Sequence, residues 1–151
     1  MATNTLIQRL FGADESGVGE DSQEVSNRVQ YETFRAGEAI SEGACVSLDL
    51  SQSTNGERGL VVKMADSSDA VPVGVAHSDA DSGEFVRVVI RGIVEEALTD
   101  GDPTAIAVGD ALTISADGKF AKAAVAQPIA AVAMEAQAAD GTSRVFVIKN
   151  Y

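Results

Sequence analysis

His77 is the only histidine of this 151-residue chain, so a Ser-His-Asp catalytic site would have to be built on it. Its nominal partners are Ser47, Ser78, Asp79 and Asp81. Neither serine lies in the Gly-x-Ser-x-Gly sequence of a nucleophile elbow, in which a tight turn exposes the serine hydroxyl. A single histidine at the end of a strand is commonly a surface or capping residue. We therefore predict that His77 has no catalytic role.

Two clusters of acidic residues have the oxygen ligands that Ca²⁺ prefers. The first runs from Asp79 to Glu84, and the second is Asp100-Gly101-Asp102. An EF-hand loop that began at Asp79 would need a bidentate glutamate at its twelfth position, but that position is Ile90. Aspartate and glycine are also common residues of tight turns. We interpret both clusters as solvated turns and predict no metal site.

Paired carboxylates for glycoside hydrolysis are conceivable at Glu95, Glu96 and Glu135. The sequence supplies no aromatic side chains around them to bind a sugar, so we interpret them as solvated carboxylates. Gly109-Asp110 is interpreted as a turn before a strand, since no phosphate-binding spacing follows it. The search for catalytic, cofactor-binding and metal-binding residues thus yields none, and we predict a scaffold without a cofactor.

The composition argues against several classes of partner. There are 23 acidic and 11 basic residues, and the formal net charge is −12. Such a surface repels nucleic-acid backbones and anionic lipid, and no cluster of Lys and Arg reverses this locally. Aromatic residues make up 5% of the chain, so stacking platforms for bases are scarce. We predict no nucleic-acid partner and no membrane partner.

Cys45 is the only cysteine, which excludes an intrachain disulfide and a cysteine-based zinc site. It alternates with Val46, as a small core residue does, and we do not assign it as a nucleophile. The first five residues lack the basic and apolar blocks of a signal peptide, and no apolar run reaches the length that spans a membrane. We expect the chain to work in a reducing cytoplasm or in a particle assembled there.

From residue 37 onward the sequence has the pattern of short β-strands separated by turns. Apolar and β-branched runs occur at residues 60–62, 86–90 and 145–148, and Asn-Gly and Asp-Gly pairs lie between such runs. Because 45% of the residues are apolar and none is tryptophan, the core must consist mainly of valine, alanine, isoleucine and leucine. We predict a mainly β protein with a small β-sandwich or barrel-like domain over residues 37–151.

The predicted domain contains an internal pseudo-repeat. Ile40 to Leu48 and Ile106 to Ile114 share one pattern, in which an apolar residue, two spacers, a glycine and two more spacers precede alternating apolar residues. A Gly-led strand follows each copy, then a strand introduced by Pro72 or Pro128, then an acidic Gly turn with a Val-rich strand. The two predicted halves span about residues 37–92 and 103–151.

Residues 1–36 differ from the rest, and we predict that they form a partly extended N-terminal arm. Four apolar residues at helix-like spacing lie near its start: Leu6, Ile7, Leu10 and Phe11. A connector rich in Gly, Ser and acidic residues follows them at residues 12–22. The segment is either a disordered terminus or an arm that becomes ordered only against a neighbour. A disordered tail has little use for the apolar cluster, so we favour an arm whose cluster docks on a partner.

Three stretches of the first half resemble one known family. They are the strand pair and Gly turn from Gly37 to Val46, the strand Pro72-Val73-Gly74-Val75-Ala76, and the Gly-Glu turn with its Val-rich strand from Gly83 to Val88. This order is similar to that of the head decoration (capsid cement) proteins of tailed double-stranded-DNA phages. The resemblance implies a compact β fold on the outer face of an icosahedral shell, often as trimers that bridge neighbouring capsomers. It supplies no catalytic or metal-binding residues.

We therefore predict a non-enzymatic structural protein that decorates and stabilises the outer surface of a phage capsid by bridging major capsid subunits. The resemblance implies two partners, the major capsid protein and copies of the chain itself in a homotrimer, on a virion assembled in the host cytoplasm. One alternative is a carbohydrate-binding or adhesin-like β module, which the shortage of aromatic side chains disfavours. A second alternative is an enzyme on a small β-barrel, which the single histidine disfavours.

Overall fold

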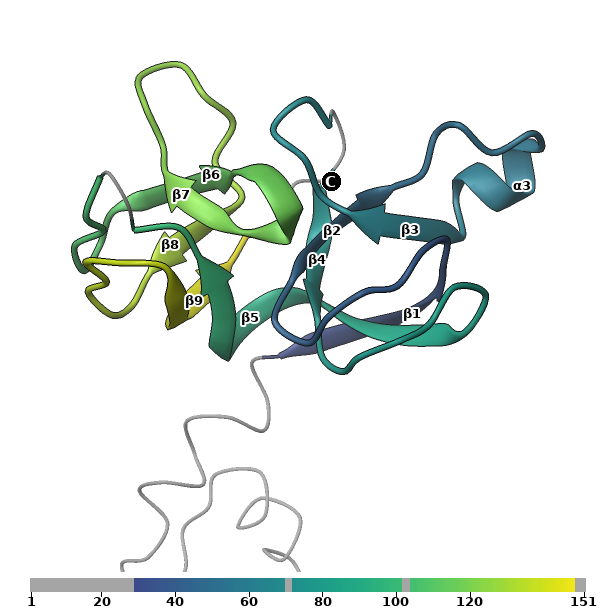
Figure 1. Ribbon diagram of the computed structural model, residues 1–151, viewed down its shortest axis with the longest axis horizontal. Helices are drawn as coiled ribbons and strands as arrows, with labels where there is room; N and C mark the ends of the chain where they lie inside the picture. Colours follow the sequence, from purple (N-terminus) through teal and green to yellow (C-terminus); the bar gives the residue numbers. More distant parts are fainter. Residues whose placement is uncertain (1–28, 70–71, 102–103, 149–151) are drawn as a thin grey trace, which may run out of the picture.

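The computed structural model describes residues 29–69, 72–101 and 104–148. Within these ranges the chain forms one nine-stranded sheet, in the order β1-β3-β2-β4-β5-β7-β6-β8-β9, and two short helical segments (Figure 1). The strands are β1 (Gln30–Ala36), β2 (Cys45–Leu48), β3 (Val61–Met64), β4 (Pro72–Ala76), β5 (Phe85–Thr99), β6 (Ala111–Ile114), β7 (Phe120–Lys122), β8 (Ala131–Ala133) and β9 (Gly141–Val147). The helical segments are α3 (Asn55–Arg58) and η1 (Ala116–Gly118). Neither helix, nor any other in the described ranges, is long and apolar enough to cross a membrane.

Strand β5 is 15 residues long and belongs to both halves of the sheet. Its first part, up to Arg91, pairs with β1 and β4, whereas its second part, from Gly92, pairs with β9 and, at Thr99, with β7. Strands β1 to β5 form a closed set, because β1 pairs with both β3 and β5. Strands β5 to β9 form a second closed set, because β9 pairs with both β8 and β5. The result is two small barrel-like lobes side by side (Figure 1). We call them lobe 1 (β1 to β4 with the first part of β5) and lobe 2 (the second part of β5 with β6 to β9). The predicted mainly β, barrel-like fold is confirmed.

The two lobes repeat one topology, which confirms the internal pseudo-repeat. In lobe 1, β2 lies between β3 and β4, and β4 pairs with β5. In lobe 2, β6 lies between β7 and β8, and β8 pairs with β9. The isolated bridges correspond as well, since Ile40 pairs with Ala80 and Ile106 pairs with Gln137. The second part of β5 is therefore the counterpart of β1.

The sheet begins at β1, before the predicted start of the domain at residue 37. Phe34 and Ala36 of this strand are buried in lobe 1, and its other residues are exposed. With so few buried positions, the strand has little apolar periodicity in the sequence. Its backbone nevertheless pairs with β5 from Gln30 to Arg35. The apolar cluster of the predicted arm, at residues 6–11, lies outside the described residues.

Valine and alanine dominate the core, as the composition predicts. Burial follows the two-residue period of a strand, because Val86 and Val88 of β5 are buried and Arg87 between them is exposed. One cluster of buried residues fills lobe 1. The other cluster crosses the lobe boundary, since Cys45 of lobe 1 belongs to the same cluster as Phe120 of lobe 2. A common apolar core therefore joins the two lobes in addition to β5.

Candidate functional site

Among the described residues, no hydrogen bond joins the side chain of His77 to any of its nominal triad partners. The buried hydroxyl of Ser47 donates a hydrogen bond to Asp69 (2.8 Å). His77 is exposed and packs edge-on against Tyr31, with 5.2 Å between the ring centroids. The carboxylate of Asp79 accepts a hydrogen bond from a backbone N–H of a neighbouring turn (2.7 Å). The remaining nominal partners, Ser78 and Asp81, are exposed.

Three of the four acidic residues considered for sugar hydrolysis and phosphate binding also have structural contacts, and the fourth, Glu96, is exposed. Glu95 forms an ion pair with Arg144 (2.5 Å), and the carboxylate of Glu135 accepts a longer hydrogen bond from the Arg144 N–H (3.5 Å). Asp110 forms an ion pair with Lys122 (2.8 Å). Within residues 29–69, 72–101 and 104–148, no group of three or more His, Cys, Asp and Glu side chains is arranged to hold a metal ion.

A thiol and two aromatic rings complete the set of residues considered for chemistry or sugar binding. Burial, with the nearby negative charge of Asp69, raises the pKa of the Cys45 thiol to about 12, so the reactive thiolate is scarce at neutral pH. The ring of Tyr31 lies 4.3 Å beneath the guanidinium of Arg87, which occupies one of its faces. Phe85 is 79% exposed. Cys45 is therefore not an activated nucleophile, and Tyr31 and Phe85 do not form a pair of stacked rings that could bind a sugar.

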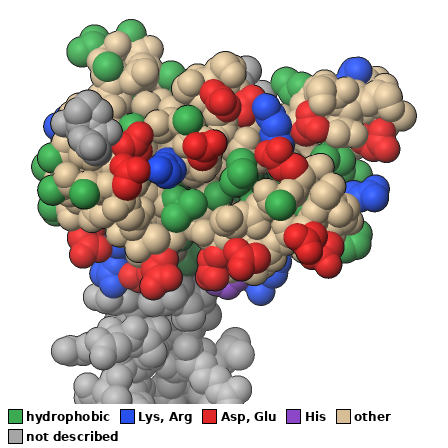
Figure 2. All heavy atoms as spheres, in the orientation of Figure 1, with side chains coloured by type: hydrophobic (Ala, Val, Ile, Leu, Met, Phe, Trp, Pro, Cys, Tyr) green, Lys and Arg blue, Asp and Glu red, His purple; other side chains and the backbone are tan. Residues whose placement is uncertain are grey.

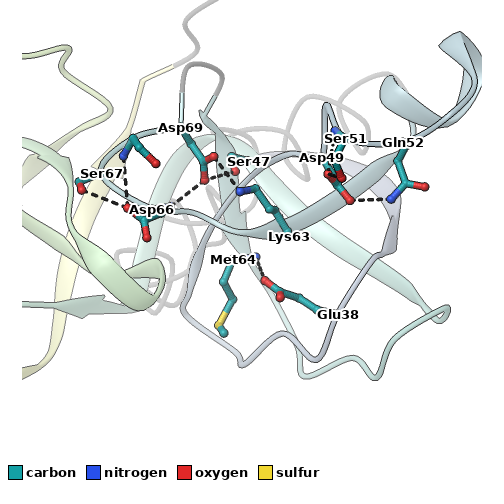
Figure 3. A network of polar contacts seen from close by, with 11 residues as sticks. Glu38, Ser47, Asp49, Ser51, Gln52, Lys63, Met64, Asp66, Ser67 and Asp69 are labelled. Atoms are coloured by element: carbon teal, nitrogen blue, oxygen red, sulfur yellow. Dashed lines mark hydrogen bonds and ion pairs between the residues drawn. The ribbon is translucent and has the colours of Figure 1, made fainter.

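Asp69 lies at the centre of a polar network in lobe 1 (Figure 3). Its carboxylate accepts hydrogen bonds from the Ser47 hydroxyl and the Asp66 N–H, both at 2.8 Å, and forms an ion pair with Lys63 (2.8 Å). Ser47 belongs to β2 and Lys63 to β3, so these contacts hold the segment after β3, residues 65–69, against both strands. In lobe 1 the segment that follows β3 is therefore polar and is attached to the sheet by these contacts.

We expect Asp69→Asn to lower the free energy of unfolding by about 1–3 kcal/mol at neutral pH, because it removes the charge that pairs with Lys63. Partial burial raises the pKa of Asp69, but hydrogen bonds from Lys63, the Asp66 N–H and Ser47 outweigh this effect and lower the pKa below its usual value. A carboxylate with a lowered folded-state pKa stabilises the fold above its unfolded-state pKa of about 4, and the contribution is lost as the pH falls through the folded-state value. Urea unfolding at several pH values should show the difference between the two proteins shrinking below about pH 4.

The matched control for this variant is Asp81→Asn, at an exposed turn position. It should change the free energy of unfolding by less than about 0.5 kcal/mol, because substitutions at exposed positions without such contacts have small effects. An equal loss of stability in both variants, or a loss in Asp69→Asn that persists at low pH, would contradict the role given to the Asp69 network.

The β7–β8 loop, residues 123–130, is the lobe 2 counterpart of this polar segment, and it is apolar. Its sequence, Ala-Ala-Val-Ala-Gln-Pro-Ile-Ala, contains no charged residue although the chain has a net charge of −12. Val125 is 100% exposed and Ile129 is 45% exposed. The loop projects at the upper left of Figure 1, and Figure 2 shows hydrophobic side chains at the tip of that projection. Exposed apolar surface of this kind is typical of a protein–protein contact.

The tip of the β7–β8 loop is a turn closed by its own hydrogen bonds. The side-chain oxygen of Gln127 accepts from the Ala124 N–H (2.7 Å), and the Gln127 N–H donates to the Ala124 carbonyl (3.2 Å). These bonds close a turn in which Ala126 has a φ of 73°. A left-handed conformation costs a non-glycine residue about 1–2 kcal/mol, and such strain is found preferentially at functional sites. The turn thus places Val125 in solvent at the tip of the loop.

A second surface feature is a hollow of about 210 Å³ that involves residues of both lobes. The buried and half-buried parts of its lining are apolar and include Val89 and Ile93 of β5. Val29, the first described residue, also lines the hollow. Ligand pockets usually enclose about 300–1,000 Å³, so this hollow suits a few side chains better than a cofactor. Three exposed glutamates belong to the lining: Glu42, Glu95 and Glu96.

The sequence interpretation missed both surface features. The β7–β8 loop had a detectable signal, which is a run of eight uncharged residues without strand alternation at residues 123–130. The hollow had no signal, because its lining combines β1, β4, β5 and the turn at Glu42 and Gly43. Only the pairing of these segments brings the glutamates together.

The structure is thus a β-rich module of two fused barrel-like lobes with an exposed apolar loop, and exposed apolar surface is a feature of proteins that bind another protein. A family model for phage cement proteins matches residues 33–149, and the chain belongs to this family. The resemblance noted in the sequence is thereby confirmed, and the protein is a structural, capsid-associated protein of a bacteriophage. Family membership also indicates a non-enzymatic role.

Among solved structures, the chain is similar to the N base of head fiber gp8.5 of bacteriophage phi29. The TM-score is 0.56 and the sequence identity is 18%, over 80% of this chain and 95% of that chain. At this identity the likeness shows a common fold. A search of curated proteins found no match.

Proposed function

We propose that the protein decorates the outer surface of the capsid and stabilises it by bridging neighbouring major capsid subunits. The β7–β8 loop carries this proposal, because it is an uncharged apolar projection on a strongly acidic protein. Burial of Val125 in a groove of the shell would contribute about 1.5–3 kcal/mol, and burial of the 45% of Ile129 that is exposed would contribute about half as much. The acidic remainder of the surface supports solubility at the high copy number of a shell component.

Bridging requires two separate attachment points. In Figure 1 the β7–β8 loop projects from the upper edge of the molecule, whereas β1 begins at the lower edge. The arm that precedes β1 is the second proposed attachment point, through Leu6, Ile7, Leu10 and Phe11. Two linked weak contacts can exceed either one alone by about 10²–10⁴-fold. A protein that binds only the assembled shell stabilises it by linkage, because its binding free energy favours that state.

The proposed partners are the major capsid protein and further copies of this chain in a homotrimer. A trimer would present three β7–β8 loops and three arms, so that one decorating unit could contact several capsid subunits at once. The proposed location is the outer capsid surface of a virion that is assembled in the host cytoplasm. Neither a nucleic acid nor a membrane, cofactor or metal ion has a role in this proposal.

Co-sedimentation with capsids that lack the protein tests the proposal. Saturable binding at a fixed ratio to the major capsid protein, with a trimer mass from light scattering, is the expected result. The bound capsids should also withstand a higher temperature before they release their contents, because binding to the intact shell opposes its disruption. A protein that stays in the supernatant at all concentrations would refute the decorating role.

We predict that deletion of residues 1–22 leaves the β domain folded and weakens capsid binding by roughly 10²-fold. The deleted residues precede β1, so every strand pair is retained. Binding is measured by sedimentation titration and folding by urea unfolding. A full-length variant with serine at Leu6, Ile7, Leu10 and Phe11 separates the apolar cluster from chain length. Unchanged capsid binding by both variants would remove the arm from the proposal.

A further inference from the structure

The hollow between the lobes combines an apolar lining with uncompensated negative charge. Ile93 and Val94 of β5, which are half-buried, provide apolar surface inside it, and Glu42, Glu95 and Glu96 stand at exposed positions of its lining. Glu95 is paired with a cation, Arg144. The carboxylates of the other two glutamates form no hydrogen bond or ion pair with any described residue. An occupant that matches this hollow should therefore be an apolar segment that carries a positive charge.

One segment of this chain has that chemistry. Residues 1–12 include the apolar residues Leu6, Ile7, Leu10 and Phe11, a single charged residue, Arg9, and no acidic residue. The following stretch, residues 13–24, is different, because it contains five acidic residues and no basic one. The match to the acidic hollow is therefore confined to the cluster at residues 6–11.

The position of Val29 places this segment within reach of the hollow. Val29 lines the hollow, so the chain that leads to the arm departs from its edge. The 17 residues between Phe11 and Val29 are rich in Gly, Ser and acidic side chains. For a Gly- and Ser-rich chain of this length the root-mean-square span is about 23 Å, and a segment tethered so closely has an effective concentration on the order of millimolar.

We propose that, in the free protein, Leu10 and Phe11 occupy this hollow of their own chain while Arg9 pairs with Glu42 and Glu96. The docked arm covers the apolar lining at Ile93 and Val94 and removes its own apolar cluster from water. A cluster of this kind left exposed would promote association before the shell is present. Attachment of the arm to the capsid then requires its release from the hollow, so that the arm acts as a latch. The latch forms without the capsid, and its test does not depend on the proposed capsid binding.

Distance measurement by double electron–electron resonance on the full chain tests the latch. Spin labels are attached at Thr5→Cys, beside the docking segment, and at Ser78→Cys, which is exposed and follows His77 of the hollow. The native Cys45 is buried and should take no label, which labelling of the parent protein verifies. A narrow distance distribution that persists when the labelled protein is diluted into unlabelled protein is expected. A broad distribution would overturn the proposal, and a narrow one lost on dilution would show docking on a second copy and overturn the same-chain assignment.

Charge exchange tests the pairing of Arg9. The variant Arg9→Glu and the double variant Glu42→Lys with Glu96→Lys should each reduce the narrow population several-fold. The combination of all three substitutions should restore it, because the opposite charges again face each other. These positions lie in the arm or are exposed, and unfolding curves of each variant verify an intact fold. If Arg9→Glu leaves the distribution unchanged, or the combination fails to restore it in a folded protein, the pairing is refuted.

Discussion

Gly43→Ala is expected to lower the free energy of unfolding by about 3–5 kcal/mol, a large part of the stability of a domain of this size. Gly43 has a φ of 78°, where a side chain is strained. A Cβ atom at this position would lie 2.1 Å from the Glu96 carbonyl oxygen. The residue also joins the lobes, because its N–H donates to Ala76 of β4 (2.9 Å) and its carbonyl accepts from Leu98 of β5 (2.8 Å). The added methyl group would force the turn at Gly43 away from β5.

The internal pseudo-repeat provides a matched control for Gly43. Gly109 holds the equivalent position in lobe 2, and its φ of 85° is nearly the same. A Cβ atom at Gly109 would meet nothing within 4 Å. Gly109→Ala should therefore cost about 1–2 kcal/mol, from backbone strain alone. The difference between the two variants in the free energy of unfolding, measured with urea, gives the contribution of the close approach between Gly43 and Glu96. Equal losses of stability would show that backbone strain accounts for both and that the contact at Glu96 contributes nothing.

The pseudo-repeat was predictable from the sequence because its signal is local. The glycine at the fourth position of each copy, Gly43 and Gly109, is required by a positive φ in both lobes, so it appears at the same place in both patterns. The alternating apolar residues that follow each glycine become β2 and β6, each of which pairs with the next two strands of its lobe. Turn chemistry and a two-residue period are short-range properties, and a single chain is enough to read them.

The closure of the lobes could not be predicted from the sequence, because it depends on pairs between strands that are far apart in the chain. Residues 93–102 were left between the two predicted halves, yet the structure pairs Ile93 to Thr99 with β9 and makes this stretch the counterpart of β1. Its two exposed glutamates, Glu95 and Glu96, lie where the register of that pairing shifts and interrupt the apolar alternation of a strand. β1 itself buries only Phe34 and Ala36. A strand that forms mainly through its pairing with other strands shows no clear apolar alternation in its own sequence.

The β7–β8 loop was missed for a different reason. Pro128 follows the same order of elements as Pro72, so the sequence predicted a strand at both prolines. Pro72 begins β4, but β8 begins three residues after Pro128, at Ala131. An apolar run without a fixed period is compatible with a buried strand or with an exposed contact surface, and hydrophobicity alone does not distinguish them. The structure shows the second case, because the turn closed by Gln127 leaves Val125 in solvent.

Val125→Asp combined with Ile129→Asp is expected to weaken capsid binding by more than about 10²-fold while the free energy of unfolding changes by less than about 1 kcal/mol. The loss of the contacts made by Val125 and by the exposed part of Ile129 accounts for about 2–4 kcal/mol, and an unpaired carboxylate in the contact adds to it. Because Val125 is 100% exposed and Ile129 is 45% exposed in the free protein, the fold should tolerate both changes. Sedimentation titration against capsids that lack the protein measures the binding.

Two substitutions in lobe 1 provide the control for the loop variant. Leu60→Asp with Leu50→Asp adds the same charge at apolar positions that are 60% and 52% exposed. If the β7–β8 loop enters the shell, this control binds as the parent protein does, because its added charges lie in lobe 1, outside the contact. Equal weakening by both pairs would assign the effect to added negative charge on a protein that already carries a net charge of −12. Full binding by the loop variant would leave the arm as the remaining attachment point, and the capsid contact would then lie on the side of the molecule where β1 begins.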